Sequence, residues 1–326
     1  MKKIFFIIII LQIFFIACSK PEKKQFSDSD DSSPNNFINK YIYDLSPEEI
    51  NLYLSWQYKQ EKLFSKRLKI IAEKQAGQPH VEGTVGEFPF EVPSEKAMYN
   101  LDESDCVTFV ENSIALSLSN SWRSYFVTLQ RIRYKNGLVG WESRNHFFEA
   151  DWEKNNSWII EDINSSLSKE NLLYYEQSVE RNLFFTMNKR EGNFPDEKVK
   201  FSYFHESKTS EILTKLIKFD KNSGKNNIYL FNLIRTNHSE KKWVGHLGFA
   251  FVENDKVYMI HSRIPEVKKE LFIDYMNDQL SKNPKRIKEK KPYIYGIRFF
   301  LLRDDPLDIL KKREGEDAPV IVIKSR

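Results

Sequence analysis

The chain has 326 residues, of which 50 are Lys or Arg and 46 are Asp or Glu, so its formal net charge is only +4. So weak a charge does not favour a nucleic-acid partner, and no zinc finger, Walker loop or dinucleotide glycine fingerprint occurs. The aromatic content of 14% indicates a sizeable core. We expect one large domain over residues 41–326, because no second linker or internal repeat interrupts that part of the chain.

The N-terminus has the pattern of an exported lipoprotein. Lys2 and Lys3 precede an apolar run over residues 4–17, and Cys18 follows Ala17. The run is shorter than the roughly 20 residues that span a bilayer, and its flanks fit a secretory signal. We therefore expect a signal peptide over residues 1–17 and a lipid anchor on Cys18 in the bacterial cell envelope. The alternative is an ordinary signal peptide or a short anchor.

The segment 18–40 is rich in Ser, Asp, Asn and Lys and poor in apolar residues, so we expect a flexible tether. If Cys18 carries lipid, Cys106 is the one free thiol of the mature chain. Exported proteins favour paired cysteines, so a single free cysteine suggests a reactive one.

The remaining elements are expected in the following order. Ser46-Pro47-Glu48-Glu49 is a capping box with Pro at the first helical position, and it predicts a helix to about Gln75, broken once and ended by Gly77. Further helices are expected over 106–118, 121–134 and 271–280, and strands over 227–234, 244–252, 256–261 and 293–302. Early helices and late strands predict an α+β domain with a largely antiparallel sheet.

Cys106 lies where an apolar-periodic helix begins, with Asp105 as its candidate N-cap. The free N–H groups and the dipole of a helix N-terminus favour an anion, so this position predicts a lowered thiol pKa. The alternative is that Cys106 is a small buried hydrophobic residue.

Two of the six histidines strengthen the catalytic interpretation. His246 opens one predicted strand and His261 closes the next, so a hairpin around residues 253–255 would bring them together. One imidazole could then act as base toward Cys106 while the other holds its tautomer. The alternative is two solvent-exposed histidines at strand ends. His205-Glu206 lacks the partner histidine of a zinc hydrolase and no GxSxG motif occurs, so we expect no metal and no organic cofactor.

Several segments follow a known pattern in order. LDESDCVTFVENSIAL resembles LxxxDCxTFVExxLAL at nearly every defining position, AGQPHVEGTV resembles GTPYxxGT, and HLGFAFVENDKVYMIHSR resembles a histidine-bearing strand pair. LQRIRYKNG, SRNHFFEADW and YIYGIRFFLLR resemble further segments of the same pattern. From about residue 70 to 303 the chain thus resembles the bacterial N-acetylmuramoyl-L-alanine amidase-like family, in the NlpC-type branch of papain-like cysteine hydrolases.

The resemblance implies a papain-like core in which Cys106 is the nucleophile, His246 the general base and His261 the orienting residue. It also implies a peptidoglycan or muropeptide substrate, cut at an amide near the sugar–peptide junction. Open alternatives are a γ-D-glutamyl endopeptidase and a catalytically silent envelope-binding lipoprotein.

Five residues near the proposed catalytic groups or in the SRNH segment are expected to bind substrate. Arg144 and His146 lie in the SRNH segment that would shape the groove, and Asp105 adjoins the nucleophile. His80 stands where the family has a tyrosine that can help the oxyanion, so it could serve as a donor. Arg263 places a cation near the proposed triad, where it could bind a stem-peptide carboxylate; the alternative is that it points to solvent.

Overall fold

The structure is a computed structural model that describes residues 36–91, 95–225 and 227–315. The chain divides into two units, Met1–Asn36 and Phe37–Arg326, and the second contains the elements described below. The predicted signal peptide and Cys18 lie outside the described residues. The globular unit begins before the expected position 41, because the ring of Phe37 is buried in the core.

The centre of the globular unit is an antiparallel sheet. The strands of the described part are β1 (Ile160–Asp162), β2 (Leu172–Val179), β3 (Glu197–His205), β4 (Ile228–Thr236), β5 (Lys242–Glu253), β6 (Lys256–Arg263), β7 (Glu266–Leu271) and β8 (Tyr293–Leu302). Their order is β2-β3-β8-β4-β5-β6-β7, and β1 pairs with β8. The strands β4 to β7 therefore follow a meander in which β8 separates β4 from β3.

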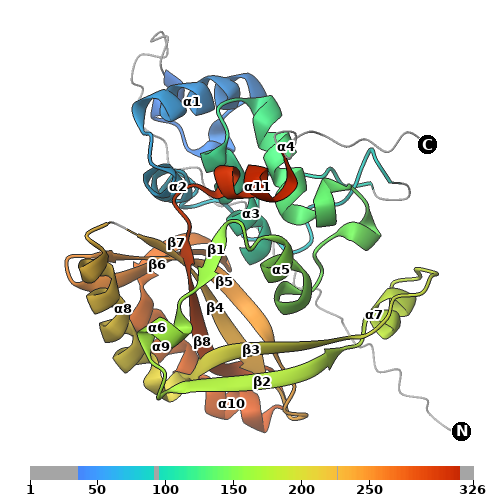
Figure 1. Ribbon diagram of the computed structural model, residues 1–326, viewed down its shortest axis with the longest axis vertical. Helices are drawn as coiled ribbons and strands as arrows, with labels where there is room; N and C mark the ends of the chain where they lie inside the picture. The colour runs from blue at the N-terminus through green and yellow to red at the C-terminus, as the bar shows by residue number, and fades with distance from the viewer. Residues whose placement is uncertain (1–35, 92–94, 226, 316–326) are drawn as a thin grey trace, which may run out of the picture. The chain divides into compact units, whose positions relative to one another are not determined.

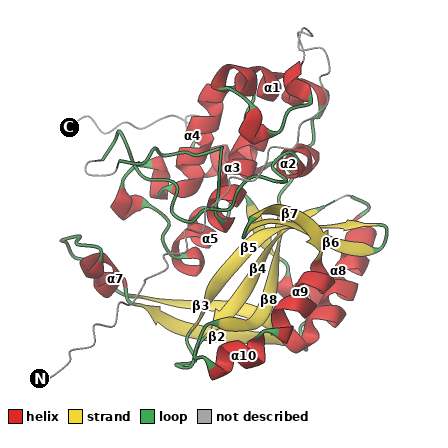
Figure 2. Ribbon diagram, turned by 180° about the vertical axis from the view of Figure 1, so that it is seen from behind, coloured by secondary structure: helices red, strands yellow, loops and turns green. Residues whose placement is uncertain are grey.

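Helices cover both faces of the sheet (Figures 1 and 2). One face packs against α1 (Pro47–Gln60), α2 (Phe64–Glu73), α3 (Cys106–Leu118), α4 (Trp122–Arg133) and α11 (Pro306–Glu314). The other packs against α6 (Asn164–Leu167), α8 (Thr209–Ser223) and α9 (Phe272–Ser281), and α10 (Asn283–Lys288) contacts β8. The short elements are η1 (Asn36–Ile38), η2 (Ile42–Asp44), η3 (Lys135–Gly137), η4 (Trp141–Ser143), η5 (Phe148–Trp152), α5 (Glu153–Asn155), α7 (Arg181–Met187) and η6 (Glu206–Lys208).

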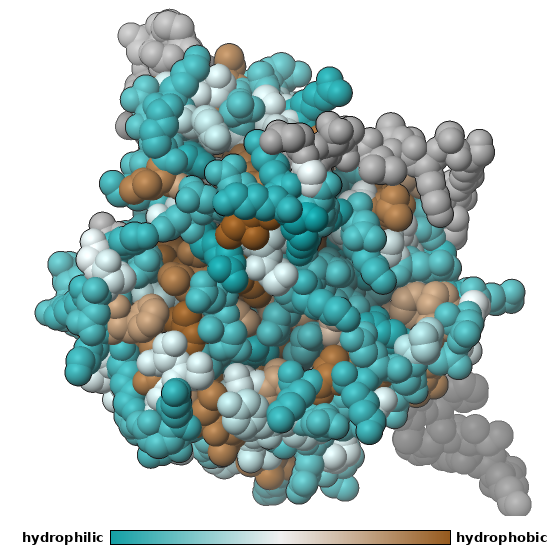
Figure 3. All heavy atoms as spheres, viewed as in Figure 1, coloured by the Kyte–Doolittle hydropathy of each residue, from teal (hydrophilic) through white to brown (hydrophobic). Residues whose placement is uncertain are grey.

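The two faces enclose two hydrophobic cores. Successive side chains of a strand point to opposite faces, so Leu230 of β4 enters the core under α3 while Phe231 enters the core under α8 and α9. A central strand covered on both faces is continuously apolar, and β4 is buried at nearly every position. On the face of the molecule seen in Figure 3, polar side chains predominate and apolar ones form small separate patches.

The predicted elements agree with the structure in most places. Ser46 and Glu49 form the capping box, and the first helix breaks between α1 and α2. The helix from Cys106 to Leu118 and the strand from Tyr293 to Leu302 have the predicted bounds. The α+β class and the antiparallel sheet are confirmed. Within the described residues, no helix has the length and apolar character needed to cross a membrane.

Candidate active site

The nucleophile candidate Cys106 is the first residue of α3, and Asp105 is its N-cap. The Asp105 Oδ1 accepts hydrogen bonds from the backbone N–H groups of Val107, at 3.0 Å, and Thr108, at 2.8 Å. The Thr108 hydroxyl in turn accepts the Asp105 N–H at 2.9 Å, which completes a capping box. In this structure the Asp105 carboxylate therefore fixes the start of the helix, although the sequence also suggested a substrate-binding role.

Cys106 as a residue is partly exposed, but its thiol lies toward β5, near the backbone N–H of Leu247. Leu247 directly follows His246, so the thiol lies beside the strand that carries the base candidate. Burial, reinforced by the neighbouring Asp105 carboxylate, raises the thiol pKa to about 12. The expectation of a lowered pKa is wrong for this structure, because desolvation of the thiolate outweighs the stabilisation from the helix N-terminus.

The two histidines meet as the hairpin pattern predicts. β5 and β6 pair through a tight turn with Glu253 opposite Lys256, and this register brings His246 beside His261. The Nε2 of His246 lies 2.6 Å from the Nδ1 of His261, and both side chains are buried. The predicted juxtaposition of these two residues is therefore confirmed.

A fourth side chain, which the sequence analysis missed, extends this arrangement to β7. The Nε2 of His261 lies 3.0 Å from Oε1 of Glu270. The Arg263 guanidinium binds the same carboxylate, with Nε at 2.7 Å and Nη2 at 3.4 Å. Burial opposes ionisation of Glu270, but the hydrogen bonds from His261 and Arg263 outweigh it and hold the Glu270 pKa at about 2. Arg263 thus holds the carboxylate that His261 contacts.

An ionised Glu270 assigns the protons along this chain. A carboxylate only accepts hydrogen bonds, so the Nε2 of His261 carries a proton and donates it. The Nδ1 of neutral His261 then accepts the Nε2–H of His246. The remaining nitrogen, Nδ1 of His246, is left as the basic one, which is the protonation state that a general base requires. We refer to His246, His261 and Glu270 as the histidine relay.

The His246 imidazole is neutral in the resting state. Burial, followed by the proximity of His261, pushes the His246 pKa well below its ordinary value. Burial also lowers the His261 pKa, although Glu270 opposes this shift. Because the thiol pKa is raised and the imidazole pKa is lowered, the site at rest holds a thiol and an imidazole rather than an ion pair.

His80 is brought to the same end of the sheet. Its Nδ1 lies 2.9 Å from the Ser262 hydroxyl, and its backbone N–H donates to the Pro265 carbonyl at 2.8 Å. It also pairs with Ser104 in a short parallel bridge, two residues before Cys106. The segment that resembles the family's tyrosine-bearing motif therefore lies between the nucleophile loop and β6.

The contacts of Arg144 and His146 are with residues other than Cys106 and the histidine relay. Arg144 forms an ion pair with the buried Glu87 at 2.6 Å. The His146 ring packs against Trp141 and Phe184, and its Nε2 lies 2.7 Å from the Trp141 carbonyl. Burial lowers the His146 pKa to about 4, so this ring is neutral at physiological pH.

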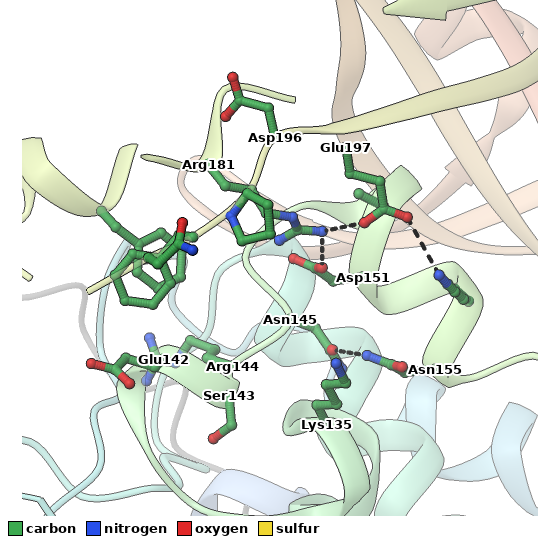
Figure 4. A pocket seen from close by; sticks show the side chains of 16 residues that line it. Lys135, Glu142, Ser143, Arg144, Asn145, Asp151, Asn155, Arg181, Asp196 and Glu197 are labelled. Atoms are coloured by element: carbon green, nitrogen blue, oxygen red, sulfur yellow. Dashed lines mark hydrogen bonds and ion pairs between the residues drawn. The ribbon is translucent and has the colours of Figure 1, made fainter. Parts of the chain in front are cut away.

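A cavity of about 480 Å³ lies beside these residues, between η4, η5 and the connection that carries α7 (Figure 4). Arg144 lines it, and Arg181 lies across it, paired with Asp151 and Glu197. The lining does not include Cys106 or the histidine relay. In the described part of the chain, no three His, Cys, Asp or Glu side chains are grouped so as to hold a metal ion.

Comparison with known proteins identifies a family and a fold for this chain. A model of the N-acetylmuramoyl-L-alanine amidase-like family matches residues 71–283. A Legionella pneumophila protein of family DUF1460 superposes with a TM-score of 0.63 at 22% identity, covering 79% of this chain and 96% of that one. An N-acetylmuramoyl-L-alanine amidase from Bacteroides uniformis superposes with a TM-score of 0.51 at 20% identity, covering 74% and 100%. At these identities the structural likeness shows the fold alone, and no curated protein matches the chain.

Proposed function

This chain belongs to the N-acetylmuramoyl-L-alanine amidase-like family, and on that premise we propose that it is a cysteine amidase of peptidoglycan or its muropeptides. The bond cut is the amide between the lactyl group of muramic acid and L-alanine. We propose that the sheet with α3 is the papain-like core of an NlpC-type hydrolase. The observation that carries the proposal is Cys106 at the N-terminus of α3, which packs on β5, the strand that carries the base of a histidine relay.

The first chemical step forms a thioester. The Cys106 sulfur attacks the lactyl carbonyl while its proton passes to Nδ1 of His246. Because thiol and imidazole are neutral at rest, proton transfer accompanies the attack instead of preceding it. The imidazolium that results is stabilised through His261 by the ionised Glu270, which is held by Arg263. The backbone N–H of Cys106, which is not one of the donors to the Asp105 cap, is suited to bind the oxyanion.

The second step releases both products. His246 returns its proton to the nitrogen of L-alanine, and the peptide leaves as an amine. A water molecule, deprotonated by His246, then attacks the thioester and releases the lactyl carboxylic acid. The sum is one amide and one water converted to one acid and one amine, with Cys106 regenerated as a thiol. No further reactant is needed.

The test is a defined substrate with two separable bonds. Purified protein is incubated with N-acetylmuramoyl-tripeptide, and the products are identified by mass spectrometry. Free N-acetylmuramic acid is expected, and Cys106→Ala should abolish it. N-acetylmuramoyl-dipeptide as the product would instead identify a γ-D-glutamyl endopeptidase. No product with any muropeptide, together with an unreactive thiol, would identify a silent binding protein and overturn the proposal.

We also propose that the mature enzyme is anchored in the cell envelope by lipid on Cys18. The support is the order of basic residues, apolar run, Ala17 and Cys18 at the N-terminus, followed by a polar segment. Such an anchor would place the enzyme where peptidoglycan and its fragments occur.

A further inference from the structure

Arg235 carries a positive charge near the proposed reacting groups. It lies near the end of β4, opposite Trp243 of β5, and is partly exposed. Its charge acts on the Cys106 thiol, on His246 and on the Tyr275 hydroxyl, so the guanidinium lies near the proposed active site. Among the residues that the structure describes, no carboxylate forms an ion pair with Arg235.

Three other arginines differ from Arg235 because each has a carboxylate partner. Arg263 is paired with Glu270, Arg298 with Glu153, and Arg144 with Glu87. A guanidinium has five donors in a planar fork that matches a carboxylate, and a partly buried one without a partner is favoured to bind an anion. Arg235 therefore has an open position for an anionic ligand, beside the nucleophile and its base.

The backbone is shaped to hold this side chain in place. β5 has an irregular register beside Leu233 and Ile234, and Gly245 lies at that irregularity. A Cβ added to Gly245 would lie 2.4 Å from the Cδ and 2.5 Å from the Cγ of Arg235. The aliphatic part of Arg235 thus lies directly across the glycine that precedes His246.

The proposed substrate offers one carboxylate at a suitable distance. In the peptide stem the carboxyl of L-alanine is consumed in the next amide, whereas D-glutamate continues the chain through its γ-carboxyl. Its α-carboxylate is therefore the free anion nearest to the bond that is cut, about 7 Å away along two extended residues. An anion at that distance from the attacked carbonyl lies within reach of a side chain that neighbours the nucleophile and base.

We propose that Arg235 determines specificity by binding the α-carboxylate of D-glutamate, the second residue of the stem. This inference rests on the proposed amidase function and adds the chemical class of the preferred substrate, a stem with a free rather than amidated α-carboxyl. Loss of a charge-assisted hydrogen bond of this kind lowers kcat/KM by roughly ten- to a hundredfold.

The test uses two ligands that differ only at this group, N-acetylmuramoyl-L-alanyl-D-glutamate and N-acetylmuramoyl-L-alanyl-D-isoglutamine. The wild type should hydrolyse the acid roughly ten- to a hundredfold faster than the amide, as measured by kcat/KM. In Arg235→Gln the rate with the acid should fall to that with the amide, and Arg235→Lys should restore part of the difference. Lys242→Gln removes a charge from the same region, where Lys242 packs on Tyr175 and Tyr295, and should leave the preference unchanged.

Binding gives an independent reading when turnover is absent. Calorimetry with Cys106→Ala should show tighter binding of the acid than of the amide, and adding Arg235→Gln should remove the difference. Equal affinities in Cys106→Ala, or an equal loss of rate with both ligands in Arg235→Gln, would overturn the role of Arg235. A retained binding preference without any hydrolysis by the wild type would refute the amidase proposal and support the carboxylate site.

Discussion

The surroundings of Cys106 and His246 favour the neutral form of each side chain in the absence of substrate. A buried thiol with an adjacent carboxylate disfavours the thiolate, and a buried imidazole disfavours the cation. The ionised Glu270 lies two hydrogen bonds from His246, where it can stabilise the imidazolium once the proton has moved. The relay thus stabilises the charged His246 that forms in the transition state more than it stabilises the neutral resting site.

The thiol should label slowly at neutral pH. Because its pKa is raised to about 12, the alkylation rate at Cys106 should keep rising with pH beyond the ordinary cysteine value of about 8.5. The measurement is iodoacetamide labelling across pH, followed by mass spectrometry of the peptide that contains Cys106. Denatured protein is the control and should titrate near the ordinary value. Rapid labelling with a midpoint below that value would contradict the neutral resting thiol.

Glu270→Gln should lower kcat with little change in KM. The amide keeps the shape of the side chain but removes the charge that stabilises the imidazolium. The expected loss is roughly ten- to a hundredfold, as for other outer residues that fix a histidine tautomer. Steady-state kinetics on muropeptides provide the measurement. Glu266→Gln in the same strand is the matched control, and an equal effect of both changes would remove Glu270 from the relay.

The same carboxylate should contribute to the pH dependence of stability. Its pKa in the folded state is about 2, below the ordinary value of about 4.3, so its contribution is fully present above pH 4.3 and is lost as the pH falls toward 2. Urea unfolding of the wild type and Glu270→Gln should therefore give curves that converge between about pH 4.3 and pH 2. Curves that stay apart by the same amount down to pH 2 would show that Glu270 stabilises the fold through packing alone.

The histidine pair could be predicted from the sequence, but Glu270 could not. A short turn between two apolar strands fixes which residues are neighbours, so His246 and His261 follow from local spacing. Glu270 is diagonal to His261 across β6 and β7, where Met259 is its direct partner. The register of this second hairpin is not visible in the charged sequence of β7. The sequence likewise could not show that Arg235 has no carboxylate partner among the described residues, because the tertiary fold determines which carboxylates lie near it.

At the scale of elements, α3 positions the nucleophile through its cap. Asp105 supplies both the hydrogen-bond acceptor for Val107 and Thr108 and part of the charge that raises the thiol pKa. These two effects can be separated by substitution, because asparagine is also a good N-cap residue but carries no charge.

Asp105→Ala should destabilise the protein by about 1 kcal/mol, the usual cost of losing an N-cap. Asp105→Asn should retain most of that stability, and both variants should shift the labelling profile of Cys106 toward lower pH. Urea unfolding and alkylation provide the two measurements. If Asp105→Asn were as unstable as Asp105→Ala, the charge of Asp105 rather than its cap would support α3.

The elements that escaped prediction share a physical cause. β2 and β3 pair over their full length, yet the connection that carries α7 separates them in the sequence. Neither strand follows the short turn that marked the β5–β6 hairpin. The helix α8 ends at Gly224 in the left-handed conformation, with a φ of 63°, but no capping residue marks its start. The positions of β2, β3 and α8 therefore depend on tertiary pairing and packing rather than on local sequence signals.

At the scale of the whole molecule, the fold places the catalytic candidates at one end of the meander. The amidase-like family match and the solved relatives agree with the fold class that the sequence indicated. The proposed attachment to the envelope concerns a part of the chain outside the described residues, and it can be tested directly.

Cys18→Ser should release the protein from membranes or block its processing. Two or more acyl chains give stable anchoring, so the wild type should sediment with membranes. Fractionation of cells that express each form, with mass spectrometry of the mature N-terminus, is the measurement. Cys106→Ser is the control and should not alter fractionation. A Cys18→Ser protein that is cleaved and membrane-bound to the same extent would exclude the anchor.

The peptide from Gly77 to His80 has a second consequence for the relay. Gly77 donates its N–H to the Val267 carbonyl, and Val267 donates to the carbonyl of Gln78, so this peptide covers the outer edge of β7. A slip of β7 by one residue would exchange its two faces, presenting Lys269 to His261 in place of Glu270. The bonds to Val267 oppose that slip. The same peptide that brings His80 to Ser262 therefore also preserves the sign of the charge at the end of the relay.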